Sequence, residues 1–274
     1  MTMGDDMSGT VSAEMITRGA EATLEVLKQG EGPLVVMLPS LGRPATDFDP
    51  IAGIVAERGY TVLRPQPRGI GRSTSPAPYK DLHDCAADIA TVIEAFGGGP
   101  AFVAGHAFGN RVTRMLATDR PDLISGISII AANVGIAPSG PKMRAAIRAS
   151  ANADLPDDER LEALRFAFFA PGNDPTGWLK DWYPEVLAAQ RHAGDQTPRS
   201  EDYAGGTGPL LYLQPDTDPL AHVEDAEIFK RELGDRVTVV VIPHASHAAL
   251  PEQPDFIAAQ LLSFMERVHP ARAA

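Results

Sequence analysis

The chain has 274 residues, 44% of them hydrophobic, and its formal net charge at pH 7 is −12. This length and apolar content can bury one sizeable core, so we expect a single α/β domain with an insertion. The negative charge argues against a nucleic acid or an anionic membrane surface as a partner. A small-molecule substrate fits this composition better.

The cysteine content and the first residues bear on the compartment. The chain has one cysteine, Cys85, which excludes an internal disulfide framework and suits a reducing compartment. Residues 1–13 lack both the basic first region and the apolar second region of a signal peptide, so we do not expect one. No stretch approaches the ~18 apolar residues of a membrane span. We expect a cytoplasmic monomer or homodimer with no cofactor.

Short apolar runs alternate with helical spacing along the first half of the chain. Residues 21–27 predict an early strand, and the turn residues 29–33 behind it predict that a hairpin opens the fold. Residues 34–38 are a continuous apolar run, typical of a strand buried on both faces of a parallel sheet. Further strands are predicted at 60–63, 101–104 and 124–130, and helices at 48–58, 82–96 and 110–118. This alternation implies a doubly wound, mostly parallel sheet.

The alternation stops between residues 135 and 208, where helical stretches are broken by segments rich in proline, glycine and aspartate. We expect an inserted helical cap there, with residues 1–134 and 209–274 forming the core domain. Strands at 210–213 and 237–242 and helices at 223–233 and 255–268 complete the predicted pattern.

Aromatic side chains gather in the predicted cap, which holds both tryptophans of the chain. They either pack the cap against the sheet or line an apolar substrate pocket. The candidates for the pocket are Phe169, Trp178, Trp182 and Tyr183.

Residues 105–109 read Gly-His-Ala-Phe-Gly and lie between a predicted strand and a predicted helix. This is the context of the nucleophile elbow, G-x-S-x-G, in which two glycines permit a sharp, strained turn that exposes a serine. Ala107 stands at the position of that serine. Because a methyl group neither attacks nor accepts a proton, the nucleophile itself is missing.

Two further loops also leave the carboxyl ends of predicted strands. Residues 215–219 carry two aspartates, and residues 244–247 carry two histidines. Ligands bind at this edge of an open α/β sheet, so an acid, a histidine and the elbow can converge there. Their order along the chain is that of the α/β-hydrolase triad, in which a buried carboxylate orients a histidine base.

Four segments together resemble the α/β-hydrolase fold family over nearly the whole chain. Residues 38–42 stand where the family has its oxyanion loop, and residues 68–73 resemble its R-G-x-G-x-S turn. The other two are the elbow and His247, which is followed by the Pro-Glu-x-Pro sequence of residues 251–254. The resemblance implies the α/β-hydrolase fold.

The resemblance also implies roles for particular residues. Asp218 matches the family's acid, with Asp216 as its competitor; the alternative for Asp216 is a turn residue that caps backbone amides. His247 matches the general base, and His244 is expected to be a loop histidine. His106 is expected to be a structural residue beside the elbow.

The oxyanion donors implied by the resemblance are the backbone amides of Leu41 and Phe108, with Ser40 beside them. The sequence departs from the family at Pro39, where a histidine is usual, and at Ala107. Loss of a triad nucleophile costs ~10⁶-fold in turnover while substrate binding survives. Two origins of Ala107 stay open, an engineered exchange that leaves an inactive variant or a natural alanine.

The leading hypothesis is a hydrolase of the Ser-His-Asp type, acting on a small apolar ester, lactone, amide or activated carbon–carbon bond. The first alternative is a cofactor-free enzyme that uses His247 and Asp218 directly as a base. The second is a non-catalytic pseudoenzyme that binds a ligand in the same pocket.

Several other side chains have ordinary interpretations. Cys85 is expected to be a small buried hydrophobe, away from the elbow. The two loop histidines lack the companions that a metal site needs, so no metal is expected. Four arginines are expected to be ion-paired or solvated rather than to clamp a substrate carboxylate: Arg68, Arg72, Arg111 and Arg114.

Overall fold

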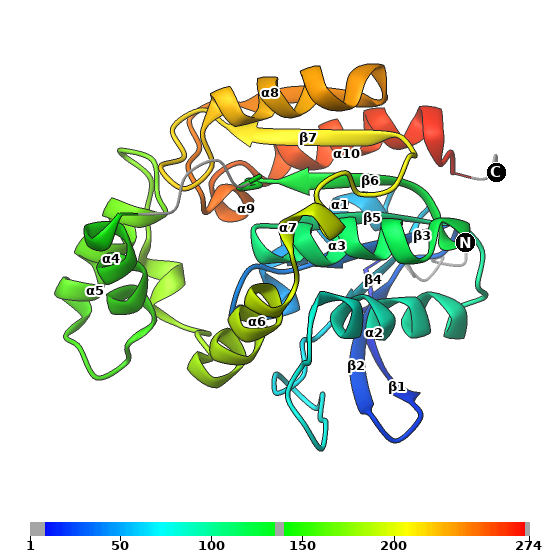
Figure 1. Cartoon of the computed structure of the whole chain (residues 1–274), viewed down its shortest axis with the longest axis horizontal. Coiled ribbons are helices and arrows are strands. Elements are labelled where there is room, and N and C mark those ends of the chain that lie inside the picture. Colours follow the sequence, from blue (N-terminus) through cyan, green and yellow to red (C-terminus); the bar gives the residue numbers. More distant parts are fainter. Residues whose placement is uncertain (1–8, 135–139, 272–274) are drawn as a thin grey trace, which may run out of the picture.

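The computed structural model describes residues 9–134 and 140–271. Within them the chain forms an eight-stranded sheet of order β1-β2-β4-β3-β5-β6-β7-β8 (Figure 1). The strands are β1 (Ser12–Arg18), β2 (Ala22–Gln29), β3 (Leu34–Leu38), β4 (Thr61–Pro65), β5 (Ala101–His106), β6 (Ile124–Ile130), β7 (Leu210–Pro215) and β8 (Val237–Ile242). Neighbouring strands from β4 across to β8 run parallel, whereas β1 and β2 pair antiparallel. The predicted α/β-hydrolase architecture with a mostly parallel sheet is confirmed.

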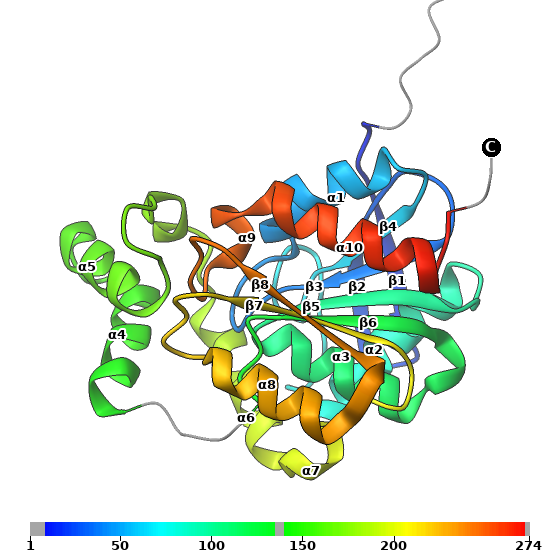
Figure 2. The same ribbon diagram turned by 90° about the horizontal axis from the view of Figure 1, so that it is seen from above.

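Helices cover both faces of the sheet. The α-helices are α1 (Asp49–Ala56), α2 (Leu82–Ala95), α3 (Phe108–Asp119), α4 (Pro141–Ala151), α5 (Asp157–Ala167), α6 (Pro184–Gln196), α7 (Arg199–Asp202), α8 (Val223–Leu233), α9 (Ala249–Glu252) and α10 (Pro254–Val268). Figure 2 shows α1 and α10 on one face and α2, α3 and α8 on the other. Each face buries an apolar core, because strands that alternate their side chains feed both layers.

The start of the fold differs from the prediction. The opening hairpin joins β1 to β2 through a turn at Gly19, whose φ is +49°, and β2 pairs with β4 rather than with β3. The predicted turn at residues 29–33 therefore connects two strands that are not neighbours. The strand β1 went unpredicted because it is an edge strand, exposed along most of its length, and has no clean apolar face.

The crossovers define a place for a ligand. Strand β3 lies between β4 and β5 in the sheet. The chain that follows β3 leads to β4 on one side, and the chain that follows β5 leads to β6 on the opposite side, so the loops after β3 and β5 diverge. Leu38 at the end of β3 is paired with Gly105 of β5. The crevice beyond such a switch point is where open α/β sheets bind ligands.

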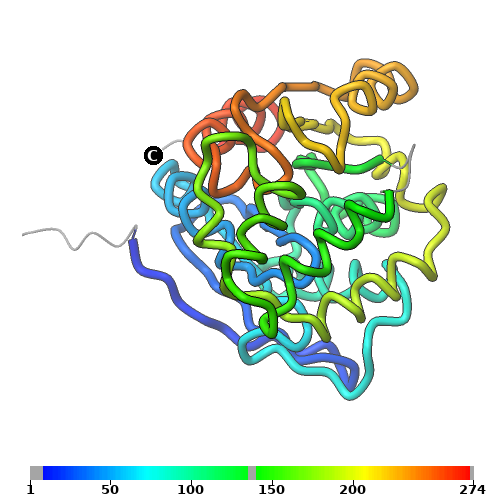
Figure 3. The backbone as a smooth tube through the Cα atoms, turned by 90° about the vertical axis from the view of Figure 1, so that its left-hand side faces the viewer, coloured from blue at the N-terminus to red at the C-terminus, as the bar shows by residue number. Residues whose placement is uncertain are grey.

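Between β6 and β7 lie α4 to α7 and the 3₁₀ helix η3 (Thr176–Leu179), which we call the inserted segment, residues 141–202. In Figure 1 its helices α4 and α5 lie beyond the carboxyl ends of the parallel strands, and Figure 3 shows them from that side, in front of the sheet. Residues 135–139 of the predicted cap lie outside the described residues. The division of the chain into a core and a cap domain stays a prediction.

Candidate active site

The turn between β5 and α3 holds Ala107 in a backbone conformation that side chains rarely adopt, with φ +48° and ψ −111°. A β-carbon at Gly105 would lie 2.3 Å from the carbonyl oxygen of Gly109, and a β-carbon at Gly109 would lie 2.3 Å from the carbonyl oxygen of Leu38. Both contacts are impossibly close, so only glycine fits at either position. The close packing of β5, α3 and β3 therefore forces the sharp turn at Ala107.

The carbonyl oxygen of Ala107 accepts a hydrogen bond from Asn110 Nδ2. Asn110 Oδ1 in turn accepts one from Arg114 Nε at 3.1 Å, and Arg114 pairs with the buried carboxylate of Asp202 at 3.1 Å. These buried contacts run from α7 to the elbow and fix the orientation of the peptide that follows Ala107.

The structure brings Asp218 and His247 together. His247 Nδ1 donates to Asp218 Oδ2 at 2.9 Å, and both residues are buried. The second carboxylate oxygen accepts the backbone amides of Leu220 at 2.7 Å and Ala221 at 3.1 Å. An imidazole that donates its single proton from Nδ1 carries its free lone pair on Nε2.

The competing carboxylate, Asp216, lies elsewhere. It accepts the backbone amides of His244 at 2.9 Å and Ala245 at 3.1 Å, which is the turn-capping arrangement. His244 itself is exposed. Asp216 thus shapes the loop that carries His247 and leaves the contact with its ring to Asp218.

The buried ring of His106 contacts the loop that carries His247. Its Nε2 donates to the backbone carbonyl of His247 at 2.7 Å, and burial lowers its pKa to about 3. No described residue hydrogen-bonds its buried Nδ1. His106 is therefore a neutral structural residue that holds the His247 backbone.

Glu252 connects the histidine loop to the inserted segment. Its carboxylate accepts the backbone amide of Ser246 at 2.6 Å, that of Ala170 at 2.7 Å, and Asn173 Nδ2 at 2.6 Å. Burial raises the pKa of this carboxyl. The glutamate of the Pro-Glu-x-Pro sequence is thus a bridge between two loops, a role that the sequence pattern did not reveal.

The amides of Leu41 and Phe108 border the same pocket as Ala107 and His247. Among the described residues, neither amide donates a hydrogen bond to a backbone or side-chain acceptor. The loop that carries Leu41 is held by α6, because the backbone amide of Gly42 donates to Gln190 Oε1 at 2.7 Å. The two residues implied as oxyanion donors thus both line the pocket, and their backbone amides are left without an acceptor among the described residues.

A pocket of about 230 Å³ opens above Ala107. Its described lining residues are Ser40, Leu41, Ala107, Phe108, Asn110, Arg111, Ala131, Asn133, Ile147, Phe168, Trp182, Leu187, Arg191, Arg199, Leu220 and His247. It is smaller than the ~300–1,000 Å³ typical of pockets for drug-sized ligands. A small substrate fits this space.

Of the four aromatic candidates for the pocket wall, Trp182 lies on it. Trp178 and Phe169 pack edge to face, with ring centroids 5.5 Å apart, in an apolar cluster with Phe168. Neither of them lines the pocket, so they stand behind its wall. Tyr183 borders a different hollow beside residues 73–79. Phe168, adjacent to one candidate, lines the pocket instead.

Ionic contacts of the four arginines confirm that they are paired. Arg68 lies 3.2 Å from Asp84 and 2.7 Å from Asp88, and Arg72 lies 2.7 Å from Glu25. Asp202 serves both other arginines, since Arg111 lies 2.8 Å and Arg114 lies 3.1 Å from it. The sequence analysis missed Arg191 and Arg199, which line the pocket, because no local pattern sets them apart from surface arginines.

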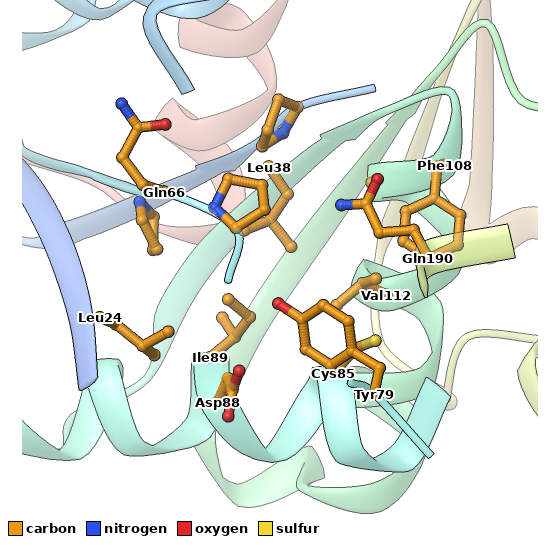
Figure 4. A pocket seen from close by; sticks show the side chains of 14 residues that line it. Leu24, Leu38, Gln66, Tyr79, Cys85, Asp88, Ile89, Phe108, Val112 and Gln190 are labelled. Carbon is orange, nitrogen blue, oxygen red and sulfur yellow. The ribbon is translucent and has the colours of Figure 1, made fainter. Parts of the chain in front are cut away.

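Cys85 lines a second, smaller cavity of about 40 Å³, together with residues of α2 and α3 (Figure 4). Burial raises the pKa of its thiol well above the ordinary value, which opposes formation of the nucleophilic thiolate. Neither this cavity nor its lining includes Ala107 or His247. Cys85 thus behaves as the small buried side chain that the sequence predicts.

In the described ranges 9–134 and 140–271, no group of three or more histidine, cysteine, aspartate or glutamate side chains is arranged to hold a metal ion. No helix in these ranges is long and apolar enough to cross a bilayer.

Comparisons with known proteins identify the family of the chain. The model of the alpha/beta hydrolase family matches residues 35–260, so the chain belongs to that family. It is 24% identical over 280 residues to 2-(acetamidomethylene)succinate hydrolase of Mesorhizobium japonicum, covering 95% of this chain and 99% of the relative. It is 26% identical to the non-heme chloroperoxidase of Burkholderia pyrrocinia, over 80% of this chain and 87% of that protein.

Solved structures agree on the fold. A thermophilic esterase from Thermogutta terrifontis superposes with a TM-score of 0.76 at 21% identity, covering 94% of this chain and 99% of the esterase. Hydrolases therefore occur among the relatives in sequence and in structure.

Proposed function

We propose that this chain has the framework of a serine hydrolase, with Ala107 at the nucleophile position. With a serine at 107, it would cleave a small ester, lactone, amide or activated carbon–carbon bond. The observation that carries the proposal is the buried pair of His247 and Asp218, 2.9 Å apart, on the same pocket as the strained turn at Ala107.

Each group has a defined task in the serine form. The hydroxyl at 107 attacks the substrate carbonyl, and His247 Nε2 takes its proton and later gives it to the leaving group. Asp218 fixes the tautomer of His247 and stabilises the imidazolium. The amides of Leu41 and Phe108 donate to the oxyanion of the tetrahedral intermediate.

In the chain as it stands, the alanine removes the first of these steps. We expect its acyl-transfer activity to be about 10⁶-fold below that of the serine form, with substrate binding retained. The relatives and structural neighbours include a 2-(acetamidomethylene)succinate hydrolase and an esterase, which supports hydrolysis as the class of reaction.

The test compares the chain with its Ala107→Ser variant, using a fluorophosphonate label and a panel of chromogenic esters. We expect labelling and turnover in the serine variant only, and the loss of both when His247→Ala is added to it. Absence of labelling in the serine variant, with the fold intact by circular dichroism, would reject the serine-hydrolase framework.

One observation favours a second candidate function. The His247–Asp218 pair keeps its full hydrogen bonding although no nucleophile stands at 107, so the pair can act as a base on a bound substrate or on water. This candidate predicts activity in the chain as it stands that His247→Ala abolishes. A non-catalytic ligand-binding protein would instead keep its ligand affinity in His247→Ala and turn over nothing in any variant.

A further inference from the structure

We propose that the wall of the Ala107 pocket formed by α6 and α7 binds a carboxylate of the substrate, through Arg191 and Arg199. The proposal rests on the proposed function, because it assumes that the substrate occupies this pocket. From the sequence we expect a small apolar substrate. The proposal instead gives the substrate a carboxylate, with its scissile bond placed at Ala107.

The charge of the pocket is opposite to that of the chain. The sequence has 36 acidic against 24 basic residues, yet the described lining of this pocket includes three arginines and neither aspartate nor glutamate. Arg111, Arg191 and Arg199 supply the positive charge, and Asn110 and Asn133 add polar groups. Positive charge in a cleft of an otherwise acidic protein concentrates anionic ligands there.

The carboxylates near the wall do not neutralise it. Asp202 is shared by Arg111 and Arg114, at 2.8 Å and 3.1 Å, and the positive charge of Arg111 acts on Arg199 as well. Burial and this neighbouring charge lower the pKa of Arg199. Three guanidinium groups around one carboxylate leave an excess of positive charge that a substrate anion would relieve.

The donors of Arg191 and Arg199 remain available to a ligand. Arg199 Nη1 makes a long hydrogen bond of 3.4 Å to the backbone carbonyl of Asn133, and neither arginine forms an ion pair with a described residue. Both residues are exposed over a large part of their surface, although the guanidinium of Arg199 is partly desolvated. Arg111, in contrast, is engaged by Asp202 and by the carbonyl of Gly194 at 3.0 Å.

A carboxylate accepts two parallel hydrogen bonds from one guanidinium and is small enough for a pocket of about 230 Å³. Much of the remaining wall is apolar and can hold the short carbon chain of an acid. Its apolar residues are Ile147, Phe168, Trp182, Leu187 and Leu220.

Two esters of equal size test the proposal, methyl hydrogen succinate and methyl levulinate. They differ in that a carboxylate replaces a methyl ketone at the far end of the acyl chain. In Ala107→Ser, with methanol release followed by NMR, we expect kcat/KM at least tenfold higher for the succinate ester. Each of Arg191→Gln and Arg199→Gln should lower that preference about tenfold, as expected for one charge-assisted hydrogen bond.

Arg165→Gln is the matched control, because Arg165 is an exposed arginine of α5 that does not line this pocket. We expect it to leave the preference unchanged. Equal kcat/KM for the two esters, or a preference that neither pocket variant reduces, would overturn the anion site.

Binding to the chain as it stands separates this proposal from the serine-hydrolase framework. Titration calorimetry needs no turnover, and we expect tighter binding of methyl hydrogen succinate than of methyl levulinate, lost in the double variant of Arg191 and Arg199. If this preference holds while Ala107→Ser hydrolyses neither ester, the anion site stands and the proposed reaction fails. If Ala107→Ser hydrolyses both esters equally and binding shows no preference, the anion site fails and the reaction stands.

Discussion

The backbone of Ala107 predicts that glycine is tolerated far better there than at Ala104, three residues earlier in β5. With φ +48° and ψ −111°, Ala107 occupies a region that costs a side-chain-bearing residue about 1–3 kcal/mol. Glycine adopts this conformation without strain. Ala104 is fully buried and has ordinary strand geometry, so it offers no strain to relieve.

The magnitudes follow from the two environments. At Ala104, glycine loses about 0.8 kcal/mol of methyl burial and about 0.5–1 kcal/mol of backbone entropy, so we expect a loss of about 1.5 kcal/mol in the free energy of unfolding. At Ala107 the same costs are offset by relief of about 1–3 kcal/mol of strain. The substitution there should lie between a slight loss and a gain of about 1.5 kcal/mol.

Urea unfolding of the chain, Ala107→Gly and Ala104→Gly measures the difference directly. Since both variants exchange alanine for glycine, their unfolded states change equally and the comparison isolates the native state. If Ala107→Gly loses as much stability as Ala104→Gly, the turn stores no strain and our account of the elbow is refuted.

Two further predictions concern the acid and the buried histidine. Asp218→Asn in the Ala107→Ser background should lower kcat about 10⁴-fold with little change in KM, because Asp218 contacts His247 and does not line the pocket. The measurement is steady-state kinetics, and a drop in kcat of less than tenfold would contradict this role of Asp218. His106 has a pKa of about 3 in the native state, against about 6.5 in the unfolded state. Below about pH 6.5 the unfolded state therefore binds a proton at His106 that the native state does not bind, and the free energy of unfolding falls as the pH drops. His106→Gln should remove up to about 1.4 kcal/mol per pH unit from that dependence, measured by urea unfolding between pH 7 and pH 4.5, and an unchanged slope would argue against a buried neutral histidine.

The elbow and the acid–base pair were predictable because their positions are set by strand ends. Ala107 directly follows β5, and the loops carrying Asp218 and His247 directly follow β7 and β8. A parallel sheet brings these loops to one edge, so a pattern in the sequence becomes a cluster in space. The choice between Asp216 and Asp218 required the structure, since both stand in the same short loop.

The pocket wall was not predictable in the same way. Phe168 lines the pocket while its neighbour Phe169 packs behind it, and no periodicity marks that difference. Arg191 and Arg199 lie more than eighty residues from Ala107 in sequence. They reach its pocket because α7 packs against α3 and α6 packs against α2. Such side chains gain their role from tertiary packing, which a single sequence does not encode locally.

The bridge made by Glu252 has a mechanical consequence. Glu252 holds Ala170 and Asn173 of the inserted segment together with Ser246, the residue before His247. The backbone amide of Ala248 adds a hydrogen bond of 2.7 Å to the carbonyl of Phe168. Any movement of residues 168–173 away from the loop that carries His247 must break these hydrogen bonds or displace that loop. Glu252 therefore couples the position of residues 168–173, which include the pocket residue Phe168, to the position of His247.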